Sequence, residues 1–117
     1  MFKLGKRQFE ADIVFKVPSM AGAEEVSMGV QFNIIGDSAY AKAAGEGDSV
    51  VATLIVSKLF GIQDEGGKLL AEDGTDSHKV IGAVIDDPIA LRAILNKYVA
   101  VVYADEVDSV RAEQVKN

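Results

Sequence analysis

Two segments of alternating apolar and polar residues near the start of the chain constrain its fold most strongly. Apolar side chains occupy every second position over residues 9–17, and the same period returns over residues 26–34. A period of two places one apolar face on a β-strand. The two segments therefore predict strands that pair antiparallel with their apolar faces together. Between them, Pro18 to Glu25 predicts a turn somewhat longer than a tight hairpin.

An isolated hairpin is only marginally stable in water, so the rest of the chain must cover its apolar face. Asp37 to Ala44 predicts a short helix, followed by glycines that indicate a hinge. A stronger helix is expected to begin at Asp48 or Ser49, because its apolar residues recur at intervals of three and four, and to end near Gly61.

Two further helices are predicted towards the C-terminal end. The first begins at a cap supplied by Thr75 or Asp76 and stops at Asp86 and Asp87. The last begins with Pro88, whose missing N–H costs nothing in the first turn of a helix, and runs to Val102 before fading after residue 105.

Strands followed by helices predict an α+β fold, in which an N-terminal antiparallel β-hairpin packs against three to four C-terminal helices. The length of 117 residues fits a single domain over residues 1–117. Within it we expect a hairpin over residues 1–35, a helical part over residues 36–110 and a polar tail over residues 111–117.

Charge and composition narrow the classes of function. The formal charge of −6 repels polyanions, so binding to nucleic acid or anionic lipid is disfavoured, and a neutral or basic protein partner fits better. The absence of cysteine excludes disulfides and thiolate chemistry. Neither a signal-peptide pattern nor an apolar run of ~18–20 residues is present, which favours a cytoplasmic protein that does not enter the membrane.

No residue pattern assembles a catalytic site. His78 is the only histidine, and we expect it to face solvent in the first turn of a helix. The acidic loop over residues 63–74 has oxygen ligands and glycines but lacks the spacing of an EF-hand, so an ion there is the weaker alternative to a solvated loop. Asp86 and Asp87 fit a helix stop and cap better than an acid–base pair. We therefore predict no enzyme, no metal and no cofactor.

Aromatic residues at strand spacing predict core packing, whereas those of the last helix leave two interpretations open. The run from Tyr98 to Ala104 is apolar on nearly every side of that helix. Such a helix is either deeply buried or presents a second surface to a partner.

The order of these segments resembles the tail assembly chaperones of long-tailed bacteriophages and prophages. The resemblance extends over nearly the whole chain. Its segments, in order, are Phe2-Lys3-Leu4, FEADIVFKVP, VSMGVQFNI, LFGIQDEGGKLLAEDG, DDPIALRAILNKYVAVVYADEV and the terminal Lys116-Asn117.

The resemblance implies a cytoplasmic, non-enzymatic factor that binds the tape measure protein, helps to recruit tail tube subunits and is absent from the mature virion. We expect the contacts on the last helix and beside the acidic loop, at Phe60, Ile62, Tyr98, Val102 and Tyr103. The alternatives are a structural minor tail or head–tail connector protein, and a small metal-assisted enzyme built on the acidic loop. An exposed strand edge would also permit a homo-oligomer.

Overall fold

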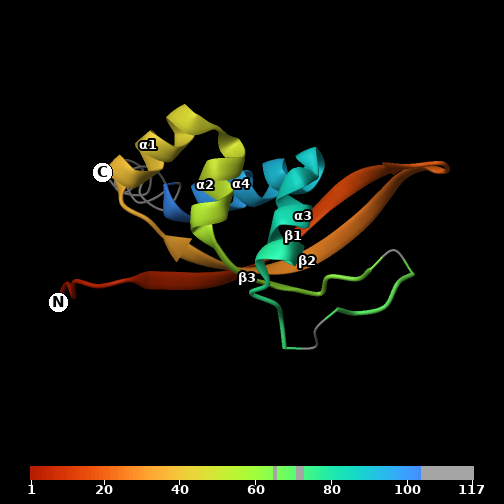
Figure 1. Ribbon diagram of the computed structural model, residues 1–117, viewed down its shortest axis with the longest axis horizontal. Helices are drawn as coiled ribbons and strands as arrows, with labels where there is room; N and C mark the ends of the chain where they lie inside the picture. The colour runs from red at the N-terminus through yellow and green to blue at the C-terminus, as the bar shows by residue number, and fades with distance from the viewer. Residues whose placement is uncertain (65, 71–72, 104–117) are drawn as a thin grey trace, which may run out of the picture.

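The computed structural model describes residues 1–64, 66–70 and 73–103. These residues form a three-stranded antiparallel sheet and four helices, which confirms the predicted α+β fold. The strands are ordered β1-β2-β3, and the helices lie together on one side of the sheet (Figure 1). The predicted polar tail over residues 111–117 lies outside the described residues.

Strands β1 (Arg7–Ser19) and β2 (Gly22–Ile34) form a hairpin that is longer than the alternation alone predicted. Pairing continues without interruption from Arg7 opposite Ile34 to Ser19 opposite Gly22. The prediction of a long turn was therefore wrong, because only two residues separate the strands. Pro18 is tolerated inside β1 because β1 is an edge strand, where a missing N–H need not break a ladder bond.

Helices α1 (Asp37–Glu46) and α2 (Asp48–Ile55) follow the hairpin. The predicted hinge between them is a single residue, Gly47, with φ of +138°. Glycine suits this position because a residue with a Cβ rarely adopts such a backbone conformation. The chain turns there and brings α2 against the sheet.

Strand β3 (Val56–Phe60) replaces the second half of the predicted long helix. Helix α2 ends at Ile55, and Leu59 pairs with Val30 of β2. Apolar residues spaced by three and four over so short a run fit a buried strand as well as a helix. Their periodicity alone therefore could not distinguish the two structures. This segment forms a strand because it pairs with the free edge of β2, and that pairing satisfies the backbone hydrogen-bonding groups of the edge.

Helices α3 (His78–Asp86) and α4 (Pro88–Val102) complete the described fold. Ser77, and not the predicted Thr75 or Asp76, caps α3 by accepting a hydrogen bond from the N–H of Val80 at 3.5 Å. Asp87 caps α4 as predicted, since its Oδ1 accepts bonds from the next two available N–H groups at 2.9 and 3.1 Å.

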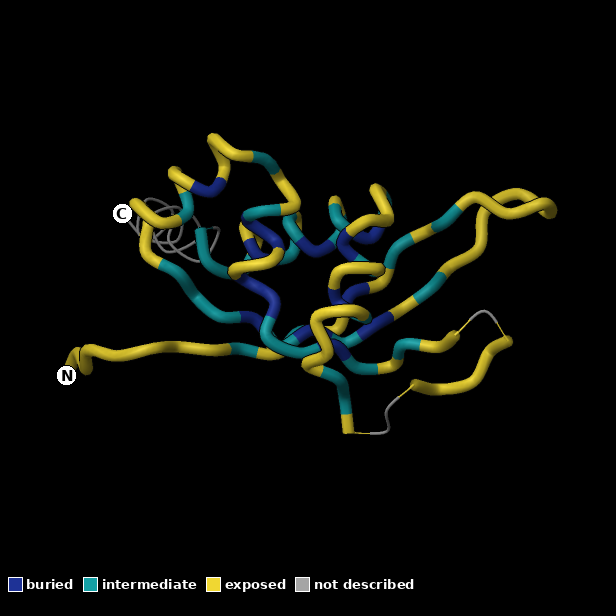
Figure 2. The backbone as a smooth tube through the Cα atoms, in the orientation of Figure 1, coloured by how far each residue is buried: buried dark blue, intermediate teal, exposed yellow. Residues whose placement is uncertain are grey.

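The core lies between the sheet and the four helices, where buried segments concentrate (Figure 2). The hairpin alternation supplies one layer of it, because Ile13, Met28, Val30 and Phe32 all face the helices. The other layer comes from the helices and β3. The largest fully buried side chains are Tyr98, Phe32, Ile55, Leu59, Ile94, Val30 and Val51.

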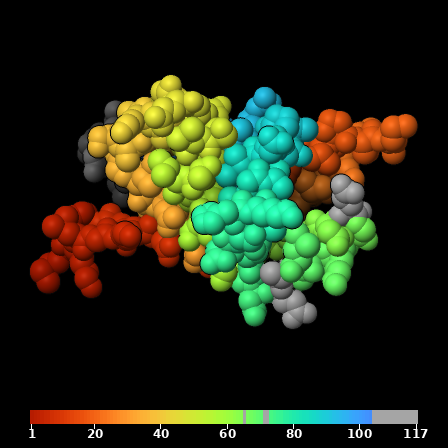
Figure 3. All heavy atoms as spheres, viewed as in Figure 1, coloured from red at the N-terminus to blue at the C-terminus, as the bar shows by residue number. Residues whose placement is uncertain are grey.

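The molecule is elongated, with principal extents of 53 × 31 × 30 Å. The hairpin turn projects at one end of the long axis, and residues 1–6 project at the other (Figures 1 and 3). Between these two projections lies the compact body of the molecule, which consists of the sheet and the helices packed on it.

Candidate binding groove

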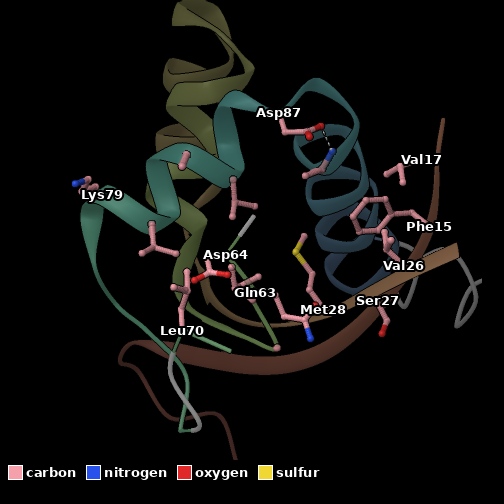
Figure 4. A pocket seen from close by; sticks show the side chains of 16 residues that line it. Phe15, Val17, Val26, Ser27, Met28, Gln63, Asp64, Leu70, Lys79 and Asp87 are labelled. Atoms are coloured by element: carbon pink, nitrogen blue, oxygen red, sulfur yellow. Dashed lines mark hydrogen bonds between the residues drawn. The ribbon is translucent and has the colours of Figure 1, made fainter. Parts of the chain in front are cut away.

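An open, mainly apolar groove lies between the outer part of the hairpin, the loop after β3, helix α3 and the start of α4 (Figure 4). Its volume is about 1070 Å³. Pockets for drug-sized ligands typically enclose ~300–1,000 Å³. This groove is slightly larger than that range and is open to solvent, so it has room for side chains of a chain segment.

The hairpin wall of the groove exists because the apolar alternation continues beyond the part that the helices cover. Met28 is buried, but Phe15, Val17 and Val26 are only half-buried. All four line the groove. At this end of the hairpin, no other described side chains cover these apolar residues completely, so part of their surface is open to solvent.

Helix α3 supplies the opposite wall. Its Ile81 and Ile85 point into the core, whereas Val80 and Val84 are half-buried and line the groove beside exposed Ala83. The apolar stripe of α3 is therefore wider than the core requires. That width is a sequence signal for a contact surface, and the contacts predicted above did not include these residues.

The loop after β3 forms the floor. Ile62 and Leu70 line the groove, and the N–H of Leu70 donates to the carbonyl oxygen of Ile62 at 2.9 Å. Asp64 organises the turn between them, because its Oδ1 accepts hydrogen bonds from the N–H groups of Gly66 and Lys68, both at 2.9 Å. The loop is thus held by its own backbone and presents its apolar residues to the groove.

The same hydrogen bonds bear on the ion considered for this loop. Oδ1 of Asp64 already accepts two backbone hydrogen bonds. Among residues 1–64, 66–70 and 73–103, no group of three histidine, cysteine or carboxylate side chains could hold a metal ion. Glu65 and Glu72 lie outside the described residues.

Charged groups at the groove are few. Asp64 and Asp87 line it, and each uses Oδ1 as a backbone acceptor. Lys79 also lines it, but its ammonium group points away from the other lining side chains (Figure 4). His78 is exposed in the first turn of α3, as predicted. The groove is therefore an apolar surface with a slight acidic bias.

The structure places only one of the five predicted contact residues at this groove. Ile62 is half-buried on its floor. Phe60 lies on the other face of the sheet, where Gly29 and Gly74 leave room for its ring. A methyl group at Gly74 would come within 2.5 Å of that ring, so the glycine permits the close approach.

Tyr98 is fully buried, so it cannot contact a partner in this fold. Its ring packs against Phe9, Phe32 and Tyr40 at centroid distances of 5.8–6.3 Å. Its hydroxyl oxygen accepts a hydrogen bond from the N–H of Ile35 at 3.1 Å. Burial raises the pKa of Tyr98 above 10.0, and this bond opposes part of that rise.

Val102 and Tyr103 are half-buried at the end of α4. The ring of Tyr103 meets those of Tyr40 and Tyr98 edge-on, and its hydroxyl donates to Oδ1 of Asp37 at 3.0 Å. Burial and then this carboxylate raise the pKa of Tyr103 to about 12. Tyr103 therefore joins α4 to the start of α1, which is a structural role.

No protein-family model, curated protein or solved structure matches this chain. In the described ranges, the helices are all too short or too polar to cross a membrane.

Proposed function

We propose that this chain is a tail assembly chaperone of a bacteriophage or prophage, which binds the tape measure protein through the groove between the hairpin and α3. It acts without catalysis, in the cytoplasm of the bacterial host, and leaves before the virion is complete. In the same role it helps to recruit tail tube subunits to the tape measure protein.

The observation that supports this proposal is the groove itself. Its hairpin wall and α3 wall bring half-buried Phe15, Val17, Val80 and Val84 to one open surface. Proteins commonly bind an amphipathic helix by laying its apolar face into such a groove. A tape measure protein is long and helical, so it offers many apolar faces of this kind.

The surroundings of the groove suit a transient complex. The net charge of −6 keeps the chaperone soluble while apolar side chains remain exposed. The groove is lined by 16 residues, fewer than the ~20–30 residues that each side of a stable protein complex contributes. Each contact is therefore weak, and repeated contacts along a long client would hold it until the tube subunits replace them.

Co-expression with the tape measure protein of the same phage or prophage tests the proposal. We expect the tape measure protein to become soluble and to elute together with this chain. Ala83→Glu is the groove variant, because Ala83 is exposed, lines the groove and lies within α3, where glutamate is a good helix former. Its control is Ala41→Glu, the same change at an exposed position of α1.

The groove variant should lose the solubilising effect at least severalfold, and the control should retain it. Equal effects of the two variants would contradict the groove as the binding site. If the tape measure protein is no more soluble with the unmodified chain than without it, the chaperone function is wrong. Finding the chain in stoichiometric amount in purified virions by mass spectrometry would instead support a structural tail or connector protein.

A further inference from the structure

Residues 1–6 form an apolar and basic segment that the body of the molecule leaves exposed, and we call it the N-terminal arm. Phe2 is 75% and Leu4 86% exposed. The arm leaves the body at the start of β1 and points away from it (Figures 1 and 3). Its organising contacts come from Arg7, whose guanidinium lies 4.4 Å from the ring centre of Phe2 and donates to the carbonyl oxygen of Lys3 at 3.4 Å.

Charge is distributed unevenly between this arm and the rest of the chain. The arm contains Lys3 and Lys6 and no acidic residue. The other 111 residues therefore hold ten of the 12 basic residues and all 18 acidic ones, a formal charge of −8 against +2 for the arm. A segment that is both apolar and basic is attracted to an apolar groove on an acidic body.

The arm cannot fill the groove of its own molecule. Phe15, on the hairpin wall, is eight residues beyond Arg7 along β1, or ~26 Å at the rise of an extended strand. Six residues span at most ~20–22 Å when fully extended. The arm also points in the opposite direction, so it would have to reverse before covering that distance (Figure 1).

The chemistry of the groove complements that of the arm. The walls are apolar, and the charged residues that line the groove in the described part of the chain are two carboxylates, Asp64 and Asp87, and one lysine. That lysine, Lys79, directs its ammonium group away from the groove (Figure 4). The groove thus offers apolar contacts to Phe2 and Leu4 and acidic neighbours to Lys3 and Lys6.

We propose that the N-terminal arm of one copy of this chain lies in the groove of a second copy. The contact joins different surfaces of the two copies, so a copy that binds one neighbour still offers its own arm or groove to another. Self-association would cover the groove when no client is bound, and a client would displace the arm. This inference rests on the groove being the binding site proposed above, but not on the identity of the client.

Two variants with complementary defects test this arrangement. One lacks residues 2–6 and keeps the groove, and the other carries Ala83→Glu and keeps the arm. Sedimentation velocity should show that the unmodified chain associates increasingly with concentration, whereas each variant alone stays monomeric. An equal mixture of the two variants should form a complex of one copy of each and nothing larger, because only one arm and one groove remain functional.

Ala41→Glu is the control and should self-associate like the unmodified chain. A synthetic peptide of residues 1–8 gives a second measurement that does not depend on a groove mutation. It should bind saturably to the variant that lacks residues 2–6, and more tightly than a peptide of the same composition in scrambled order. Higher salt should weaken this binding, because part of the attraction is between charges.

The inference is wrong if the unmodified chain is monomeric at every concentration, if either variant self-associates like the unmodified chain, or if the mixture forms no complex. Its failure is distinct from that of the chaperone function. A monomeric chain that still solubilises the tape measure protein would overturn the arm contact alone. A self-associating chain that leaves the client insoluble would overturn the chaperone function alone.

Discussion

Two glycines of this chain lie in contrasting surroundings, one crowded and one with open space around it. Gly74 has φ of +88°, and a Cβ there would meet the ring of Phe60 at 2.5 Å. Gly82 lies inside α3, where a Cβ would meet nothing within 4 Å. The same methyl group should therefore have opposite effects at the two positions.

We predict that Gly74→Ala lowers the free energy of unfolding by more than ~1 kcal/mol, because the new side chain is both strained and overpacked. Gly82→Ala should raise it by ~0.5–1 kcal/mol, because alanine is the better helix former. Denaturant unfolding of both variants gives the comparison. Similar free energies for the two variants would contradict both the backbone strain at Gly74 and its close approach to Phe60.

Tyr103 links stability to pH at the alkaline end. Its pKa is about 12 in the folded chain and ~10 in an unfolded one. Between these values the folded state keeps a proton that the unfolded state has lost. The stabilising contribution of Tyr103 is therefore fully present below pH ~10, and the free energy of unfolding falls as pH rises from there towards 12.

Tyr103→Phe removes this group, so the variant should lose stability less steeply above pH ~10 than the unmodified chain. Some fall should remain, because burial also raises the pKa of Tyr98. Denaturant unfolding at a series of alkaline pH values measures both slopes. Identical slopes would mean that burial and Asp37 do not raise the pKa of Tyr103 in the folded chain.

At the scale of the elements, local chemistry made some of the structure predictable. The start of α4 could be read from Asp87 and Pro88 alone, because a cap and a proline in the first turn need no distant partner. The hairpin faces could be read from their period of two for the same reason.

Strand β3 could not be predicted in this way, because its state depends on β2. Leu59 is buried in a strand here, yet it follows Ile55 by four residues and Val51 by eight, which is equally the spacing of one face of a helix. Pairing of Leu59 with Val30 on one side and with Thr75 on the other settles the conformation. Such pairings join residues far apart in sequence, so the sequence pattern of β3 itself does not indicate them.

The cap of α4 gives a prediction at this scale. Asp87→Ala removes the acceptor for two N–H groups at the start of the helix and should cost ~1 kcal/mol, within a range of ~0.5–2 kcal/mol. Asp87→Asn keeps an oxygen acceptor and should cost less. Thermal unfolding compares the two. Equal melting temperatures for the alanine variant and the unmodified chain would contradict the cap.

The contact residues were harder to predict than the fold. Tyr98 of the last helix and Ile62 beside the acidic loop were both predicted as contacts, and only the packed structure separates the buried residue from the groove residue. An apolar run looks the same in sequence whether it faces a core or a partner. The wide apolar stripe of α3, with Val80 and Val84, was the clearest signal available for the groove.

At the scale of the whole molecule, the groove is lined by the outer part of the hairpin and by α3, whereas the N-terminal arm projects from the other end of the elongated body (Figure 1). The body is acidic and the arm is basic. This arrangement makes the apolar groove the surface on which both proposals depend: it would hold the tape measure protein, and in its absence the arm of another copy.

The most direct test of the groove is methyl NMR of this chain, labelled at isoleucine, leucine and valine, alone and in complex with the tape measure protein. If the groove binds the tape measure protein, the methyl signals of Ile62, Val80 and Val84 should shift most. Leu54 and Val99 are 45% and 40% exposed but do not line the groove, so their signals should stay in place. Shifts at Leu54 and Val99 without shifts at the groove residues would show that the tape measure protein binds elsewhere on this chain.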